Sequence, residues 1–199
     1  MLLYNSPISG NCYKVRLLFA HLGIEYERRE VDVVDRSDPR DFLADLNPAR
    51  RAPTLVLDDG RPLAESNAII WYFAEGTRFV PGDRFERAQV LQWLFWEQYE
   101  HEPAIAVARF WLAYSGRPES VQDRLEGWQK QGAKALAAME QHLDGRSWFV
   151  GDSMTIADIA LYAYTHVADQ GGFDLEPYPA IRTWLDRVAL QPSHVPIDA

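Results

Sequence analysis

Two short stretches of this chain decide its fold class: Ala52-Pro53-Thr54-Leu55 and Glu65-Ser66-Asn67-Ala68-Ile69. Pro53 precedes a strand predicted at 54–57, and a proline without an N–H belongs at the edge or turn of a sheet. If the bond before Pro53 is cis, the backbone N–H and C=O of Ala52 turn outward and can pair with a peptide-like ligand. We therefore expect a cis Pro53 and a ligand contact from the backbone of Ala52.

The second stretch places a carboxylate and a hydroxyl where a strand meets a helix. Glu65 and Ser66 follow the strand ending at Ala64 and precede the apolar run 69–73. Ser66 is expected to be the N-cap, with the first free N–H groups of the helix beside it. A carboxylate, a hydroxyl and helix N–H groups together suit a ligand that carries both an ammonium and a carboxylate.

Composition limits the classes of protein to consider. The chain has 199 residues, enough for one large or two small domains, and 47% are hydrophobic, enough for a real core. Its net charge of −9 argues against general nucleic-acid binding, which needs a basic face. No apolar stretch is long enough to span a membrane, and residues 1–4 lack the pattern of a signal peptide. With a single cysteine, the chain is expected to be cytoplasmic.

Strand and helix patterns alternate in the first third of the chain. Val15, Leu18, Phe19 and Leu22 have helical spacing, and Gly23 fits the end of that helix. The expected elements are strand 2–5, helix 10–22, strand 26–33, a short helix from Asp38-Pro39 to Leu46, strand 54–57, a hairpin at Asp59-Gly60, a strand at Leu63 and helix 66–74. This order is that of a thioredoxin-like α/β domain.

The remainder of the chain is helical in pattern. Thr155 and Asp158 have the spacing of a capping box. The expected helices are 86–113, 120–143, one that begins at Thr155, and 181–190. We predict an α+β protein of two domains: residues 1–76, a linker at 77–84, and an all-α domain at 85–199.

Together these motifs resemble the cytosolic glutathione S-transferases, in particular their bacterial theta-, phi- and nu-like members. The motifs are Ser9-Gly10-Asn11-Cys12-Tyr13-Lys14-Val15, Asn47-Pro48, Pro53 with Glu65-Ser66, and Thr155-Ile156-Ala157-Asp158. The resemblance implies a thioredoxin-like domain that binds glutathione and a helical bundle that forms a pocket for a small hydrophobic electrophile. It also implies a homodimer, and attack by the glutathione thiolate on the electrophile.

Ser9 falls where theta- and zeta-like transferases place their catalytic serine. A free thiol has a pKa of roughly 8.5, so a hydroxyl donor beside a helix N-terminus would increase the thiolate fraction. By this resemblance Ser9 is a hydrogen-bond donor to the thiolate. The structural alternative is that Ser9 only caps the first helix.

Asn11 and Cys12 are further candidates in the same turn. Asn11 matches an asparagine of nu-like transferases and would donate to the sulfur, or it would be the helix N-cap. Cys12 lies three positions after the residue at which some relatives carry a reactive cysteine. We expect Cys12 to pack inside the first turn, as buried cysteines usually do.

The resemblance also assigns the two ends of glutathione. Arg51 is placed to hold the glycyl carboxylate, which an arginine can do with two parallel hydrogen bonds. Ala52 and Pro53 are expected at the cysteinyl part, and Glu65 and Ser66 at the γ-glutamyl end. Arg50-Arg51-Ala52 departs from the family's usual Gly-x-Val, which puts the fit of the carboxylate pocket in question, and Arg50 is equally well interpreted as a surface charge.

Aromatic residues crowd the predicted helix 86–113. Packing of the core is their ordinary use. The alternative is that one face lines the electrophile pocket, with Tyr99, His101 and Arg109 as its polar groups. His101 has no second histidine or cysteine at ligand spacing, so no metal is expected.

Two other functions share this pattern. One is a glutathione-dependent disulfide-bond reductase or peroxidase of nu-like type, and the other is a non-catalytic binding protein of the same fold. Retention on immobilised glutathione, followed by paired conjugation and disulfide-reduction assays, distinguishes the three.

Overall fold

The computed structural model describes residues 1–35, 41–116 and 118–199, and the chain folds into two compact units. Unit 1 comprises Met1–Glu75 together with Pro192–Ala199, and unit 2 comprises Gly76–Gln191. The terminal segment 192–199, predicted within the helical domain, therefore packs with the first unit instead.

Unit 1 is built on a sheet of four strands in the order β2-β1-β3-β4. Its elements are β1 (Leu2–Asn5), α1 (Gly10–Leu22), β2 (Glu27–Glu30), the 3-10 turn η1 (Asp41–Leu43), β3 (Thr54–Val56), β4 (Pro62–Ala64) and α2 (Ser66–Ala74). β1 pairs in parallel with β2 and antiparallel with β3, which pairs antiparallel with β4. This is the predicted thioredoxin-like domain.

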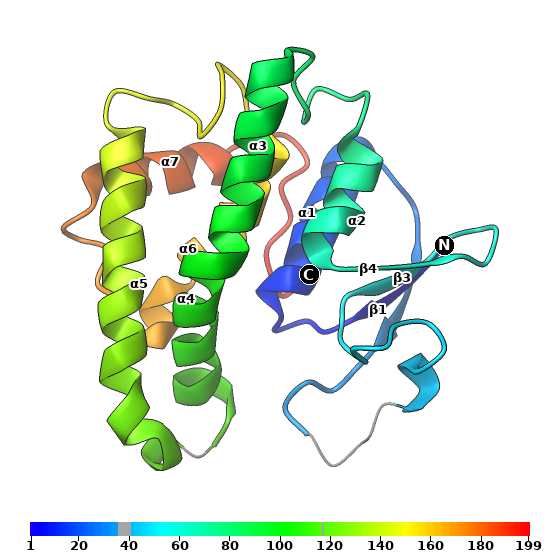
Figure 1. Cartoon of the computed structure of the whole chain (residues 1–199), viewed down its shortest axis with the longest axis horizontal. Coiled ribbons are helices and arrows are strands. Elements are labelled where there is room, and N and C mark those ends of the chain that lie inside the picture. The colour runs from blue at the N-terminus through cyan, green and yellow to red at the C-terminus, as the bar shows by residue number, and fades with distance from the viewer. Residues whose placement is uncertain (36–40, 117) are drawn as a thin grey trace. The chain divides into compact units, whose positions relative to one another are not determined.

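Both faces of this sheet are covered. Successive strand residues point to opposite faces, so the side chains of Leu3 and Tyr4 are buried on opposite sides of the sheet. Tyr4 packs with Val31 and Leu43. On the other face α1 and α2 lie side by side (Figure 1) and bury Phe19 and Ile69 completely.

Local signals set the ends of α1, and β2 is shorter than predicted. Gly23 has φ 64 and ends α1 as predicted, because glycine enters the left-handed region without cost. The strand predicted at 26–33 spans only Glu27–Glu30, although the N–H of Val31 still donates to the carbonyl of Asn5 at 2.7 Å and its side chain joins the small core around Tyr4. The helix start predicted at Asp38-Pro39 lies outside the described residues.

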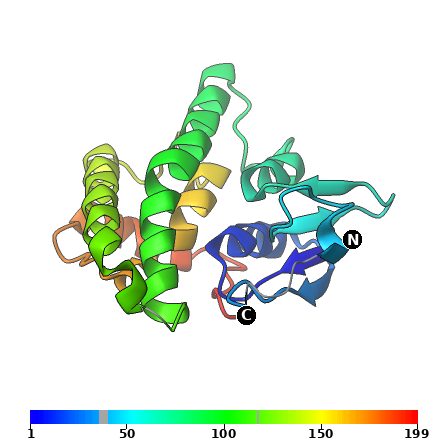
Figure 2. The ribbon, with the colours of Figure 1, turned by 60° about the horizontal axis from the view of Figure 1, so that its bottom comes forward.

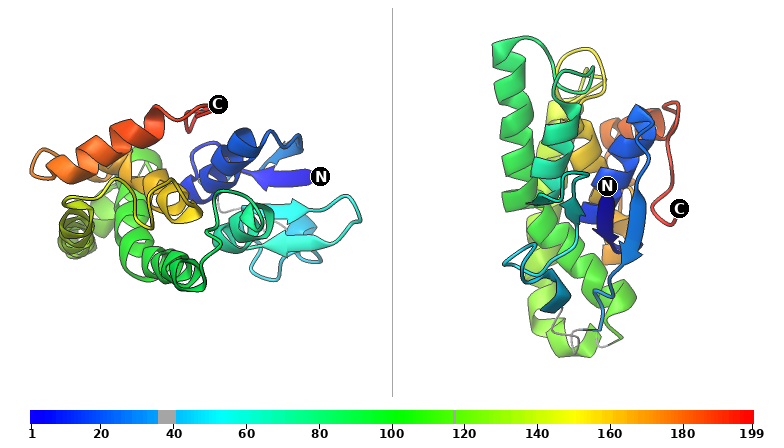
Figure 3. Two further views of the ribbon diagram at one scale, coloured as in Figure 1. Left: turned by 90° about the horizontal axis from the view of Figure 1, so that it is seen from above. Right: turned by 90° about the vertical axis from the view of Figure 1, so that its right-hand side faces the viewer.

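The terminal segment is hydrogen-bonded to three side chains of α1 and to one of β2. The Tyr13 hydroxyl donates to the carbonyl of Val195 at 2.7 Å, and His21 Nδ1 lies 2.9 Å from that of Pro192. Arg16 donates to the carbonyl of Ile197, and Arg28 to that of Ala199 at 2.8 Å. Figure 3 shows this segment running beside α1.

Unit 2 is all-helical. Its elements are α3 (Arg84–Trp96), the π-helical segment η2 (Glu97–His101), α4 (Glu102–Arg109), the π-helical segment η3 (Phe110–Tyr114), the 3-10 turn η4 (Pro118–Val121), α5 (Gln122–Leu143), α6 (Ile156–Thr165), the 3-10 turn η5 (Ala168–Gly171) and α7 (Pro179–Ala189). In place of the single helix predicted at 86–113, the chain forms a continuous run of two α-helices and two π-helical segments (Figure 2).

The core of unit 2 centres on α6, all of whose residues are buried. The predicted capping box of Thr155 and Asp158 is present. Beyond the box, Asp158 also accepts the indole N–H of Trp184 at 3.0 Å and the backbone N–H of Phe149 at 3.1 Å. One buried carboxylate thereby joins α6, α7 and the loop that precedes α6.

Candidate functional site

Ser9 stands at the start of α1, where the chain leaves β1. Its backbone is extended, and its side-chain oxygen accepts the N–H of Cys12 at 3.3 Å. Ser9 is therefore the N-cap of α1, which confirms the capping interpretation and excludes Asn11 as that cap. Capping uses a lone pair of the hydroxyl and leaves its proton to donate elsewhere.

A hydrogen bond joins the first turn of α1 to that of α2. The Ser66 hydroxyl donates to the amide oxygen of Asn11 at 3.1 Å, and Ser66 is only 4% exposed. The structure thus brings Asn11 and Ser66 together, as a common site requires. Two helix N-termini that meet in this way concentrate N–H groups and positive partial charge, which favours anions.

The prediction that Ser66 is an N-cap is corrected by one position. Glu65 occupies the cap position of α2 with φ 68, and Ser66 is the first helical residue. Within the described residues the Glu65 side chain does not cap the helix, and it is exposed. The cause is the abrupt turn from β4 into α2, which forces a non-glycine residue into a strained backbone region.

Lys14, which sequence reasoning missed, lies beneath this junction. It is fully buried, with Nζ 3.3 Å from Asn67 Oδ1 and 3.5 Å from Ser66 Oγ. The available signal was a lysine inside the apolar helix pattern, one turn after Asn11, since lysines are almost never fully buried without a partner.

Cys12 packs inside the first turn, as expected. It is fully buried, and its sulfur accepts the N–H of Ser6 at 3.3 Å. Burial raises the pKa of the thiol to about 11, so Cys12 stays protonated near neutral pH. A protonated, enclosed thiol has the character of a packing residue rather than a nucleophile.

The turn before β3 has the predicted cis peptide bond between Ala52 and Pro53. Asn47 supports this turn through its amide N–H groups, which donate to the carbonyl of Arg51 at 3.1 Å and to Thr54 Oγ1 at 2.9 Å. Arg51 itself is exposed.

Arg50 is a surface charge in the structure. Its guanidinium pairs with Asp41 at 2.6 Å, and both side chains are largely exposed. This agrees with the interpretation of Arg50 as a surface residue.

The three polar candidates of unit 2 have three different environments. Tyr99 is 79% exposed, whereas His101 is fully buried with Nε2 2.9 Å from Thr165 Oγ1. Arg109 is buried and donates to Gln170 at 2.8 Å and to the Tyr114 hydroxyl at 2.8 Å. His101 and Arg109 thus take part in the packing of unit 2, and the assignment of the three side chains to an electrophile pocket stays a prediction.

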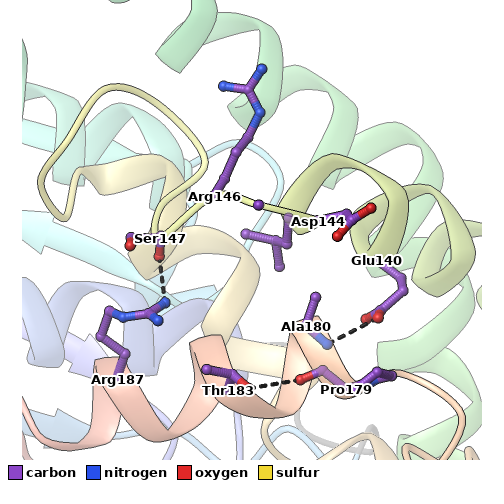
Figure 4. Close-up of a pocket in the computed structure, with 10 residues that line it drawn as sticks. Glu140, Asp144, Arg146, Ser147, Pro179, Ala180, Thr183 and Arg187 are labelled. Carbon is purple, nitrogen blue, oxygen red and sulfur yellow. Dashed lines mark hydrogen bonds between the residues drawn. The ribbon is translucent and has the colours of Figure 1, made fainter.

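A pocket of about 410 Å³ lies between the end of α5 and α7 (Figure 4). Two of its charged side chains make hydrogen bonds to backbone groups of unit 2. Glu140 accepts the N–H groups of Ala180 and Ile181 at the start of α7, and Arg187 donates to the carbonyl of Ser147. This pocket shares no residue with the predicted site. In the ranges 1–35, 41–116 and 118–199 no cluster of His, Cys, Asp or Glu is arranged for a metal ion.

Comparison with known proteins identifies the class that this fold and site define. Residues 8–75 match the glutathione S-transferase N-terminal domain, and residues 122–187 match the glutathione S-transferase C-terminal domain. The chain belongs to the glutathione S-transferase family.

Individual relatives resemble the chain over nearly its whole length. A crystal structure of a glutathione S-transferase from Pseudomonas fluorescens is 47% identical, with a TM-score of 0.95 and 98% coverage of both chains. The disulfide-bond oxidoreductase YfcG of Escherichia coli is 28% identical, over 96% of this chain and 91% of that protein. A maleylacetoacetate isomerase of Pseudomonas aeruginosa is 30% identical, over 97% and 93%.

Proposed function

We propose that the protein is a glutathione transferase that joins the glutathione thiolate to a small hydrophobic electrophile. The observation that carries this proposal is the hydrogen bond between Ser66 and Asn11, because it unites the starts of α1 and α2. Ser9, Asn11, Glu65 and Ser66 then belong to one anion-favouring corner of unit 1.

In this mechanism the ends of glutathione are bound separately from its thiol. Glu65 pairs with the γ-glutamyl ammonium, and Ser66 with the N–H groups of α2 holds the adjacent carboxylate. Ala52 binds the cysteinyl backbone beside Pro53, and Arg51 reaches the glycyl carboxylate.

The thiol is proposed to lose its proton to solvent water beside Ser9. The Ser9 hydroxyl donates to the resulting thiolate, with Asn11 in support, and so stabilises the charged form. Sulfur then forms a bond to the electrophilic carbon, and a leaving group such as halide departs with the electron pair of the bond that breaks. The helical unit is proposed to bind this electrophile. Tyr99, His101 and Arg109 remain candidates for that pocket, with the exposed Tyr99 the most accessible.

The direct test measures glutathione binding by calorimetry and conjugation of a chromogenic aryl halide. Binding with conjugation supports the proposal, whereas a folded protein that fails to bind glutathione contradicts it.

Similarity to a disulfide-bond oxidoreductase favours a second candidate, glutathione-dependent disulfide reduction. The same site would serve, but the electrophile would be a disulfide sulfur. A reductase assay with a small disulfide, run beside the conjugation assay, decides between them. A protein that binds glutathione and catalyses neither reaction would be a binding protein of this fold.

We further propose that the protein is a homodimer in the cytoplasm. An apolar strip on α3 and the adjoining η2 segment supports self-association: Phe85, Leu91 and Phe95 of α3 and Tyr99 of η2 are 71%, 37%, 73% and 79% exposed. Large exposed apolar strips commonly mark interfaces. Phe95→Glu should yield a monomer in sedimentation analysis, whereas Arg187→Glu should not. No helix in the described part of the chain is long and apolar enough to cross a membrane.

A further inference from the structure

We propose that Asn47 is a positioning residue that turns the backbone N–H of Ala52 toward the cysteinyl carbonyl of glutathione. Asn47 acts together with Thr54 by holding the carbonyl of Arg51, which belongs to the same peptide group as that N–H. This inference rests on the proposed function, because it explains how the ligand contact assigned to Ala52 is built.

Backbone groups determine which way the Asn47 amide faces. The N–H of Ala49 lies 2.9 Å from Asn47 Oδ1, and a backbone N–H can only donate, so this atom is the amide oxygen. The amide nitrogen therefore lies on the other side, 3.1 Å from the carbonyl oxygen of Arg51 and 2.9 Å from Thr54 Oγ1. Asn47 is only 5% exposed, and these bonds use its amide oxygen and both of its amide hydrogens.

The hydroxyl of Thr54 is a second donor to the same carbonyl. Because this hydroxyl accepts from Asn47, its own proton remains to donate, and the Arg51 carbonyl oxygen lies 2.7 Å away. A carbonyl oxygen can only accept, so the direction of this bond is fixed. Thr54 is fully buried. Two donors from inside unit 1 thus hold the carbonyl of Arg51, although Arg51 as a whole is exposed.

The held carbonyl sets the direction of the next N–H group. The peptide bond between Arg51 and Ala52 is trans, and in a planar trans peptide the C=O and the N–H point in opposite directions. The N–H of Ala52 is therefore turned away from Asn47 and Thr54. It donates to no group in the part of the chain that the structure describes. A backbone donor of this kind is paired by water or by a ligand, and a peptide carbonyl fits it.

Loss of Asn47 would release this peptide group. The Arg51 carbonyl would keep only the Thr54 hydroxyl, which would itself be free to turn. The peptide group could then rotate, and the N–H of Ala52 would face the ligand in only a fraction of the molecules. The affinity for a ligand that needs this N–H falls by the same fraction.

Calorimetry with three thiol ligands tests the role of Asn47. Glutathione and γ-glutamylcysteine amide both carry the cysteinyl carbonyl, but only glutathione has the glycyl carboxylate. γ-Glutamylcysteamine keeps the γ-glutamyl end and the thiol, and it lacks both of the other groups. Asn47→Ala should weaken the binding of each of the two carbonyl-bearing ligands about tenfold, as expected for one lost hydrogen bond, and should leave the binding of γ-glutamylcysteamine unchanged.

Variants of Thr54 separate this role from general disturbance of the turn. Thr54→Val removes the hydroxyl and should weaken glutathione binding about threefold, whereas Thr54→Ser keeps the hydroxyl and should bind like wild type. Thr183→Val makes the same change at an exposed position of α7, where the hydroxyl also donates to a backbone carbonyl. It should leave all three affinities unchanged. If Asn47→Ala does not fold, Thr54→Val takes its place with the three ligands.

Failure of the inference and failure of the proposed function give different results. If wild type binds glutathione and Asn47→Ala weakens all three ligands equally, or none of them, Asn47 does not act through the N–H of Ala52. The inference is also wrong if wild type binds γ-glutamylcysteine amide no more tightly than γ-glutamylcysteamine, because the cysteinyl carbonyl then has no donor. If wild type does not bind glutathione at all, the proposed function is wrong, and the role of Asn47 falls with it.

Discussion

The hydroxyl oxygen of Ser9 accepts the backbone N–H of Cys12 at 3.3 Å, so one residue caps the turn that encloses the other. Ser9, the half-buried member of this pair, is proposed to donate its proton to a ligand, whereas burial keeps the thiol of Cys12 protonated. Two residues that both carry nucleophilic atoms are thereby given different roles.

Ser9→Ala should lower the conjugation rate more than the affinity for glutathione, because the two ends of the tripeptide supply most of the binding. The pH–rate profile should move to higher pH, since the thiolate loses a donor. Loss of the cap should also reduce the free energy of unfolding by about 1 kcal/mol. Rates across pH, calorimetry and urea unfolding measure the three effects.

Cys12→Ala is the matched control in the same turn. Burial raises the pKa of this thiol to about 11, so the pH–rate profile should stay as in wild type. If Cys12→Ala abolishes activity while Ser9→Ala keeps the wild-type profile, the reductase function with Cys12 as reactive thiol replaces the proposal.

Glutathione binding should require the carboxylate of Glu65, whereas the stability of the fold should favour a glycine at this position. Glu65→Ala and Glu65→Gly both remove the carboxylate, and each should weaken glutathione binding by about 2–3 kcal/mol. At φ 68, however, glycine relieves backbone strain that alanine keeps. The free energy of unfolding of Glu65→Gly should therefore exceed that of Glu65→Ala by about 1 kcal/mol, which urea unfolding measures. Unchanged affinity in both folded variants would refute the ligand assignment.

Two glycines of α5 should respond oppositely to alanine. A Cβ at Gly132 would lie 2.4 Å from Phe173 Cε1, so Gly132→Ala must displace a buried ring and should cost about 1–3 kcal/mol of stability. A Cβ at Gly127 meets nothing within 4 Å, and Gly127→Ala should add about 0.5–1 kcal/mol through helix propensity. Thermal or urea unfolding measures both, and a shift of the same sign would contradict the packing described at Gly132.

Asp158 should make stability fall as pH rises through the acid range. Burial raises the pKa of this carboxyl from 3.8 to about 6, against the hydrogen bonds that it accepts. Between those values the folded chain holds a proton that the unfolded chain has released, so the contribution of Asp158 is present below about pH 4 and is lost as pH rises through about 6.

Asp158→Asn removes the titrating group and should flatten this part of the stability profile. It should also cost about 2 kcal/mol, because N–H groups of Phe149, Thr155 and Trp184 then lose a carboxylate acceptor. Urea unfolding at several pH values compares the two proteins. Identical slopes between about pH 4 and 6 would show that Asp158 does not titrate there.

Local signals in the sequence predicted most of the fold. Gly23 ends α1, and Thr155 with Asp158 starts α6, because turns and caps depend on residues close in the chain. The π segments at Glu97–His101 and Phe110–Tyr114 escaped prediction, since one additional residue in a turn barely alters a helical pattern.

The residues of the candidate site belong to local sequence patterns, whereas the contacts between them do not. Ser9, Glu65 and Ser66 were visible as local patterns, yet the cap of α2 moved by one residue because of the backbone at Glu65. The contacts of Lys14 with Ser66 and Asn67 join positions 52 and 53 residues apart in the chain. Only the packing of α1 on α2 brings them together, and no spacing rule contains that packing.

The tie between α1 and the terminal segment has a consequence for biosynthesis. Tyr13 and Arg16 leave the ribosome 182 and 181 residues before Val195 and Ile197, whose carbonyl groups they bind. Unit 1 is therefore made of two segments that are far apart in the sequence. A protein fragment of residues 1–75 alone would lack the packing that residues 192–199 supply. During translation, unit 1 can complete its fold only after the whole helical unit has been synthesised.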